Sequence, residues 1–227
     1  KTGKWLLQDT SNYLLDSNNP ELIKLNASDK NITLVPQGSG EITSLVAHTP
    51  DTKVDVIFPA LHGPFGEDGS MQGFLKIANV PFVGAGVLGS AVGMDKDIMK
   101  RLLKEAGIPI PKFLVAHSIK QFSYEEITAT LGSPVFVKPA NLGSSVGVHK
   151  VKNEKEFAEA LDDAFTYDTK VLIEEAIVGR EIECSVLGNE DPMASVPGEV
   201  IPSHEFYSYD AKYIDENGAV VEIPAKV

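Results

Sequence analysis

A lysine directly before a loop of small polar residues is the pattern in this chain with the clearest chemistry. Lys138 ends the strand-forming run Val135–Lys138, and a second such run follows at Val146–Val151. Residues 140–145 between them are Ala-Asn-Leu-Gly-Ser-Ser. Backbone N–H groups and hydroxyls in such a loop can bind phosphate oxygens, while the lysine neutralises their charge. The pattern predicts a β-hairpin whose tip covers nucleotide phosphates, with a solvated turn as the alternative.

A histidine and a glutamate follow a second strand-like run. The nearly continuous apolar residues 54–61 are typical of a strand that is buried on both faces. Residues 72–78 favour a short helix and residues 80–84 another strand, so this region predicts a βαβ unit in a parallel sheet. Such sheets bind ligands beyond the carboxyl ends of their strands, which makes His62 and Glu67 candidate site residues. In the alternative interpretation His62 orders the loop, and Glu67 and Asp68 are solvated.

A second lysine candidate lies near the start of a predicted helix. In Met94–Gly107 the apolar residues recur at helical spacing, and Gly107 followed by Pro109 is a normal stop signal. Lys96 stands at the helix start, where a cation is unfavourable against the helix dipole. This position is weak support for a function, and a solvated side chain is the alternative.

The later part of the chain predicts an antiparallel arrangement of strands and helices. Residues 113–116 form a predicted strand, and Asn153 with a glutamate three residues later predicts a helix start. Two further strands are expected, one ending at Glu174 and one beginning at Glu181. Carboxylates there can accept hydrogen bonds from a ribose or an adenine amino group, although glutamates at strand ends are usually exposed.

The last candidate segment is rich in tyrosine. Residues 206–213 hold three tyrosines and Lys212, and the third tyrosine is Tyr213. Such an amphipathic loop suits an active-site lid or a packed surface loop.

The composition restricts the class of protein. The chain has 227 residues, 43% of them hydrophobic, a net charge of −12 and a pI near 4.8. An acidic surface argues against a nucleic-acid partner and against an anionic membrane surface. The single cysteine, Cys184, is expected to be a small buried core residue, and it is compatible with a reducing cytoplasm. No segment approaches the length of a transmembrane span, and no signal peptide opens the chain.

Five segments in order resemble the ATP-grasp family, and within it the D-alanine–D-alanine ligase family. They are residues 61–73, 81–100, 136–151, 172–188 and 206–213. The resemblance implies an α/β fold, in which an N-terminal parallel-sheet (pre-ATP-grasp) domain precedes an α+β ATP-grasp fold. It implies an incomplete Rossmann-like domain at 1–84, a central subdomain at 85–182 and the start of a C-terminal subdomain at 183–227.

The resemblance also implies roles for individual residues. The residues matching the family's ATP site are Lys96, Lys138, Ser145, Glu174, Glu175, Ile177 and Glu181. Those matching catalytic positions are Ser144, Lys212 and Tyr213, and those matching the first-substrate neighbourhood are His62 and Glu67. No metal ligand is expected within the chain, because the family's magnesium ligands would follow Val227.

The reaction that the resemblance implies joins two D-alanines through a D-alanyl phosphate, for peptidoglycan precursor synthesis. ATP and Mg²⁺ or Mn²⁺ are the implied cofactors, the cytoplasm the implied location, and a homodimer the implied assembly. Alternatives are a D-alanine–D-lactate ligase, another ATP-grasp carboxylate–amine ligase, or a non-catalytic nucleotide-binding module. Both chain ends look cut, since the family's opening strand would precede Lys1, and a polypeptide that truly stopped at both ends is expected to be inactive.

Overall fold

A computed structural model describes residues 4–8, 14–15, 24–25, 28–45, 52–203 and 218–227. The chain divides into two compact units, Lys1–Ser90 and Ala91–Val227. The domain boundaries expected after residues 84 and 182 stay predictions. Within the described ranges, no helix has the length and apolar character that crossing a bilayer requires.

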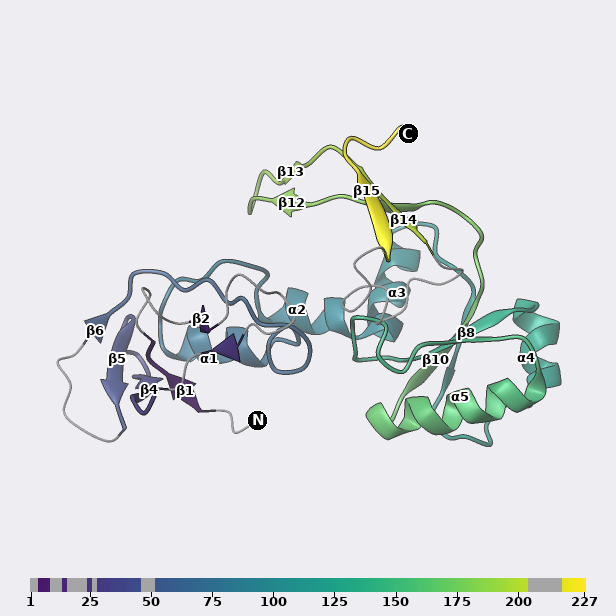
Figure 1. Cartoon of the computed structure of the whole chain (residues 1–227), viewed down its shortest axis with the longest axis horizontal. Coiled ribbons are helices and arrows are strands. Elements are labelled where there is room, and N and C mark those ends of the chain that lie inside the picture. The colour runs from purple at the N-terminus through teal and green to yellow at the C-terminus, as the bar shows by residue number, and fades with distance from the viewer. Residues whose placement is uncertain (1–3, 9–13, 16–23, 26–27, 46–51, 204–217) are drawn as a thin grey trace. The chain divides into compact units, whose positions relative to one another are not determined.

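The first unit is built on short antiparallel strands and a helix (Figure 1). Its four-stranded sheet has the order β1 (Trp5–Leu6), β4 (Asn31–Leu34), β5 (Glu41–Ser44) and β6 (Thr52–Lys53), and a separate pair is formed by β2 (Leu14–Leu15) and β3 (Lys24–Leu25). Helix α1 (Ser70–Ile77) confirms the predicted helix. Its buried Leu75 packs with Leu34 and Val80 in the small core of this unit.

The strands predicted at residues 54–61 and 80–84 are wrong. In the described residues these segments meet only at one parallel bridge, between Ile57 and Phe82. Val56 and Phe58 are 58% and 73% exposed, so this apolar run is not covered on both faces. An apolar run becomes a buried strand only where neighbouring chain covers it, and local composition does not report those neighbours.

The second unit contains the predicted antiparallel sheet. Its strands lie in the order β7 (Phe113–Ala116), β10 (Val171–Glu175), β8 (Val135–Pro139) and β9 (His149–Val151), and every neighbouring pair is antiparallel. The predicted hairpin is confirmed, because β8 pairs with β9 and Val137 lies opposite His149. Its second strand is shorter than the predicted run.

Two helices pack on one face of this sheet and contact each other (Figure 1). Helix α5 (Glu154–Tyr167) begins after Asn153, whose side chain accepts a hydrogen bond from the Glu156 N–H at 3.0 Å, as predicted. Helix α4 (Tyr124–Leu131) lies where the sequence allowed either a helix or a loop, and Ser123 and Glu126 form a capping box at its start. The shared core contains Ile127, Val135, Val137, Phe157, Leu161, Val171 and Ile173.

Along each strand, the residues between the core positions point to the other face of the sheet. On β8 and β10 these include Lys138 and Glu174, because neighbouring strand residues face opposite sides. Helix α3 (Lys96–Glu105) supplies the side chains that meet them, as its Lys100 contacts Glu174. The predicted helix over Met94–Gly107 is therefore confirmed, and helix α2 (Val87–Met94) precedes it.

The end of the chain forms small exposed sheets. Strand β14 (Gly198–Pro202) pairs with β11 (Glu181–Glu183) and β15 (Ala219–Glu222), and β12 (Val186–Leu187) pairs with β13 (Met193–Ala194). The single strand predicted from Glu181 is thus split in two. Cys184 lies in the break and is exposed, so its predicted place in a buried core is wrong.

The central strand β10 should carry much of the stability of the second unit. Replacing the fully buried Ile173 with alanine removes methylene contacts from the core and should lower the free energy of unfolding by about 2 to 5 kcal/mol. Ile108, which is 49% exposed, is the matched control, and Ile108→Ala should cost less than about 0.5 kcal/mol. Urea denaturation of both variants measures the difference, and equal losses would contradict the described core.

Candidate functional site

A buried carboxylate between two lysines lies at the centre of the candidate site. Glu174 on β10 is 4% exposed. One carboxylate oxygen lies 3.0 Å from the Lys100 ammonium, and the other contacts the Lys138 ammonium. Glu174 is therefore not one of the exposed strand-end glutamates that the alternative interpretation expected. A charge this deeply buried requires partners of opposite charge, which the two lysines provide.

Helix α3 and strands β8 and β10 bring Glu174 and the lysines together. Lys96 and Lys100 are four residues apart on α3 and therefore share one face of the helix. Lys138 lies on β8 opposite Leu172 of β10, two residues from Glu174. The Lys100 ammonium also lies 5.4 Å from the ring centre of Phe113, which is paired with Glu174 across the sheet. This cation–π contact further fixes Lys100 against the sheet.

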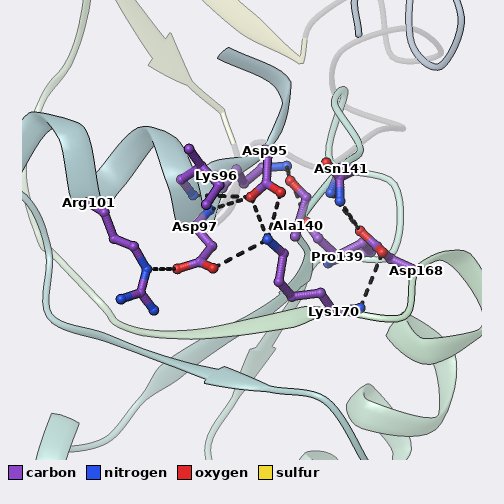
Figure 2. Close-up of polar contacts among 10 residues, drawn as sticks. Asp95, Lys96, Asp97, Arg101, Pro139, Ala140, Asn141, Asp168 and Lys170 are labelled. Atoms are coloured by element: carbon purple, nitrogen blue, oxygen red, sulfur yellow. Dashed lines mark hydrogen bonds and ion pairs between the residues drawn. The ribbon is translucent and has the colours of Figure 1, made fainter. Parts of the chain in front are cut away.

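The predicted Lys96 holds the base of the Gly-Ser loop (Figure 2). Its ammonium donates to the Pro139 and Ala140 carbonyls at 3.2 Å each and to the Leu142 carbonyl. Burial, and secondarily the positive charge of Lys138, lower the pKa of Lys96 to about 8, although Glu174 acts in the opposite direction. With a pKa of about 8, this ammonium is still mostly protonated at neutral pH but loses its proton far more readily than an ordinary lysine.

An ion-pair cluster fixes the start of α3 (Figure 2). Asp95 caps the helix by accepting hydrogen bonds from the backbone N–H groups of Asp97 and Ile98. The Lys170 ammonium contacts both oxygens of Asp95, at 2.8 and 2.6 Å, and one oxygen of Asp97 at 3.3 Å. Burial alone would raise the pKa of Asp95, but the hydrogen bonds from Lys170 and Ile98 lower it. The cluster thereby anchors Lys96, the next residue, beside the loop.

The loop itself is a tight turn that contains several left-handed residues. Ser144, Ser145 and Gly147 have positive φ angles of 54°, 58° and 65°. At Gly147 a side chain would clash, because a Cβ would lie 2.8 Å from the ring of Tyr167. Turns can present backbone N–H groups to an anion, although in this loop the Val146 and Val148 N–H groups already donate to the Gly143 and Ser145 carbonyls. The geometry suits the predicted phosphate contact of both serines, which stays a prediction.

A cavity of about 680 Å³ lies beside the hairpin in the second unit. It is lined by Phe136 and Lys150 of the hairpin, by Ile177 and Glu181, and by Ile201 of β14. Apolar walls with a few polar groups are typical of a site for a small planar ligand. The structure thus brings Ile177 and Glu181 to one cavity.

Two hydrogen-bonded glutamates border this part of the site. The Glu175 carboxylate accepts a hydrogen bond from the Lys112 N–H at 2.7 Å, and its own N–H donates to the Lys112 carbonyl. Glu199 on the cavity wall binds Arg180 through two contacts of 2.8 and 2.6 Å. The first set of contacts joins the end of β10 to the residue before β7, and the second fixes a charged pair in the cavity wall.

The remaining predicted residues lie elsewhere. His62 and Glu67 belong to the first unit, where His62 is exposed and Glu67 accepts a hydrogen bond from the Gly63 N–H at 2.6 Å. Glu67 therefore orders its own loop, whereas the alternative interpretation assigned that task to His62 and expected Glu67 to be solvated. A substrate role for either residue stays a prediction. Lys212 and Tyr213 lie outside the described residues.

Sequence reasoning did not identify three residues of the site. Lys100 could have been found from its four-residue spacing to Lys96, which predicts a shared helix face. Asp95 is an N-cap residue type directly before the helix. Lys170 precedes a strand far along the chain, and no local signal pairs it with Asp95.

A divalent metal ion has no adequate ligands in the described residues. Within those ranges, no three histidine, cysteine, aspartate or glutamate side chains gather in a group that could hold one. The described residues therefore do not fit a magnesium or manganese site, and the expectation that the ligands follow Val227 stays a prediction.

Comparisons with known proteins agree on one family. A family model described as "D-ala D-ala ligase N-terminus" matches residues 1–85, and one described as "D-ala D-ala ligase C-terminus" matches residues 102–227. A D-alanine–D-alanine ligase from Oceanobacillus iheyensis is 54% identical over 231 residues, covering 100% of this chain. The chain spans 63% of the length of that curated relative.

Solved structures give the same result. The D-alanine–D-alanine ligase from Coxiella burnetii is 41% identical with a TM-score of 0.69, over 76% of this chain and 49% of that one. The VanG D-Ala:D-Ser ligase from Enterococcus faecalis is 32% identical with a TM-score of 0.72, over 93% of this chain and 59% of that one. These neighbours confirm the fold class that the resemblance implied.

The lowered pKa of Lys96 is measurable. With lysine labelled at the ε-carbon, the NMR resonance of Lys96 should titrate with a midpoint near pH 8, because burial disfavours the ammonium form. The spectrum of a Lys96→Met variant, which lacks this resonance, supplies the assignment. A Lys96 resonance without any transition below pH 10 would contradict the described environment.

Two substitutions separate the helix cap from the ion pair at Asp95. Both Asp95→Asn and Asp95→Ala remove the charge that faces Lys170, but asparagine keeps an oxygen that can cap α3. The alanine variant should therefore be less stable than the asparagine variant by about 1 kcal/mol. Asp162, an exposed residue within α5, is the control, where alanine should be no worse than asparagine. Equal unfolding free energies for the two Asp95 variants would exclude the capping role.

Proposed function

Because the chain belongs to the D-alanine–D-alanine ligase family, we propose that the full-length protein joins two D-alanines with consumption of ATP. The chain spans 63% of a curated relative, so the activity is proposed for the longer protein. The product is D-alanyl-D-alanine, a precursor of peptidoglycan.

The observation that carries this proposal is a group of lysines at the base of the Gly-Ser loop. Lys100 and Lys138 both contact the buried Glu174, and Lys96 lies close enough to Lys138 for that positive charge to lower its pKa. Such a group of cations requires an explanation in a chain whose net charge is −12. The phosphates of a nucleotide are anions of the right kind, and phosphoryl transfer depends mainly on positioning and on charge neutralisation.

The neighbouring features suit the rest of the nucleotide. The cavity lined by Ile177 and Glu181 has space for an adenine and a ribose, with the glutamate as an acceptor for ribose hydroxyls. The Gly-Ser loop supplies N–H groups for the phosphates. We propose ATP-binding roles for Lys96, Lys138, Ser145, Glu174, Glu175, Ile177 and Glu181, catalytic roles for Ser144, Lys212 and Tyr213, and substrate contacts for His62 and Glu67.

The proposed reaction has two steps. A carboxylate oxygen of the first D-alanine attacks the γ-phosphorus of ATP, and ADP leaves, which gives D-alanyl phosphate. The amine of the second D-alanine then attacks the acyl carbon, phosphate leaves, and the new amide nitrogen loses a proton. Lysines near the phosphates stabilise the charge that develops in the first step. A loop that excludes water protects the acyl phosphate from hydrolysis.

Further properties of the full-length protein belong to the same proposal. Use of Mg²⁺ or Mn²⁺ is supported by the requirement of ATP chemistry for a divalent cation. Action in the cytoplasm and assembly as a homodimer are supported by the family resemblance alone.

Phosphate release from ATP tests the proposed function. With Mg²⁺, release by the full-length protein should require D-alanine and fail with L-alanine, and mass spectrometry should detect the dipeptide. Additional phosphate release and a mixed product only when D-lactate or D-serine is added to D-alanine would identify a different acceptor. ATP binding without any D-amino-acid dependence would leave a nucleotide-binding module and overturn the ligase.

A pair of lysine variants tests the site. Lys138→Met should reduce kcat/KM for ATP by about a hundredfold, the cost of one charge-assisted contact to the reacting phosphates. Lys104→Met is the matched control, because Lys104 is an exposed lysine near the end of α3. Similar activity of the two variants would contradict the assigned phosphate site.

A further inference from the structure

We propose that Lys100 is a positioning residue that serves as the permanent counter-ion of Glu174, so that Lys138 can leave that carboxylate and bind nucleotide phosphates. This inference rests on the proposed function, since it presupposes that Lys138 meets phosphates. Lys100 is not among the residues that line the cavity, and its contacts are with Glu174 and the ring of Phe113.

The two lysines differ in their access to solvent. Side-chain exposure is 7% for Lys100 and 22% for Lys138, against 6% for Glu174. Lys138 stands at the end of β8, directly before the loop, whereas Lys100 is enclosed between α3 and the sheet. Its ammonium lies over the ring of Phe113 at 5.4 Å, which is a second contact within the protein. Lys138 is therefore the lysine that can move away from Glu174, whereas Lys100 remains paired with it.

Charge balance requires one of them to stay. A buried carboxylate that loses its last cation is strongly destabilised, because neither water nor another charge compensates it. With Lys100 in place, Glu174 keeps an ion pair at 3.0 Å when Lys138 moves. Without Lys100, Lys138 would be the remaining lysine paired with Glu174, and any phosphate would have to compete with that carboxylate. Lys96 is not a substitute, because its ammonium is bound to three loop carbonyls.

The inference makes a selective prediction for ligand binding. In the full-length protein, Lys100→Met should weaken ADP binding by about tenfold to a hundredfold, the effect of one lost charge-assisted contact. Adenosine has no phosphate, so its affinity should change less than about twofold. Lys100→Arg keeps the positive charge and should retain most of the ADP affinity, and Lys104→Met should bind both ligands as the unchanged protein does.

Isothermal titration calorimetry of ADP and adenosine against these proteins provides the test. Equal weakening of both ligands by Lys100→Met would show a general structural role and overturn the inference, as would unchanged ADP affinity. If the unchanged protein binds ADP while Lys100→Met has no effect, the proposed function survives and only this inference fails. If the unchanged protein binds neither ligand, the proposed nucleotide site fails as well.

A second measurement is made on the unchanged protein, and variants serve only to assign its resonances. With ε-carbon-labelled lysine in the unchanged protein, ADP should shift the NMR resonance of Lys138 and leave that of Lys100 in place. The resonances are assigned with Lys138→Met and Lys100→Arg. A shift of the Lys100 resonance as large as that of Lys138 would show that both lysines leave Glu174, and would overturn the inference.

Discussion

The ion pairs of Glu174 are the constraint on which the rest of the second unit depends. A carboxylate that is 4% exposed on a central strand must meet cations from the elements next to it. One cation comes from α3 and the other from β8, so the requirement also determines which face of α3 lies against the sheet. The opposite face of the same sheet is covered by α4 and α5 through apolar contacts. One face of the sheet is therefore built for packing and the other for charge.

A second set of charges determines where α3 begins. Asp95 caps the helix, Lys170 binds Asp95 and Asp97, and the backbone N–H of Lys96 donates to the Ala140 carbonyl at 3.1 Å. The Ala140 N–H in turn donates to the Lys170 carbonyl at 2.9 Å. The start of the helix, the base of the loop and the start of β10 are thus one connected network. A change in any of them displaces the lysine that faces the loop.

The sequence predicted those elements whose signals are local. The hairpin, α3 and α5 were identified because strand composition, helical spacing and a cap residue lie within each segment. The strand predicted at residues 54–61 failed because burial depends on neighbours distant in sequence, and Phe58 has none that cover it in the described residues. Lys138 and Glu174 were identified singly as site residues. Their pairing, and the part played by Lys100, depend on the register of β8 against β10, which no local pattern contains.

The lysines of the site are satisfied by protein acceptors, and this arrangement affects what the site can select. Lys138 contacts Glu174, and Lys96 contacts three carbonyl groups. A ligand must therefore interact with these ammonium groups more strongly than the protein acceptors do. A polyphosphate can, because it carries several negative charges on closely spaced oxygens. A neutral or singly charged ligand gains too little to displace the existing contacts. The internal acceptors thus reduce the repulsion between the neighbouring lysine ammonium groups. They also favour highly charged phosphates over weaker anions.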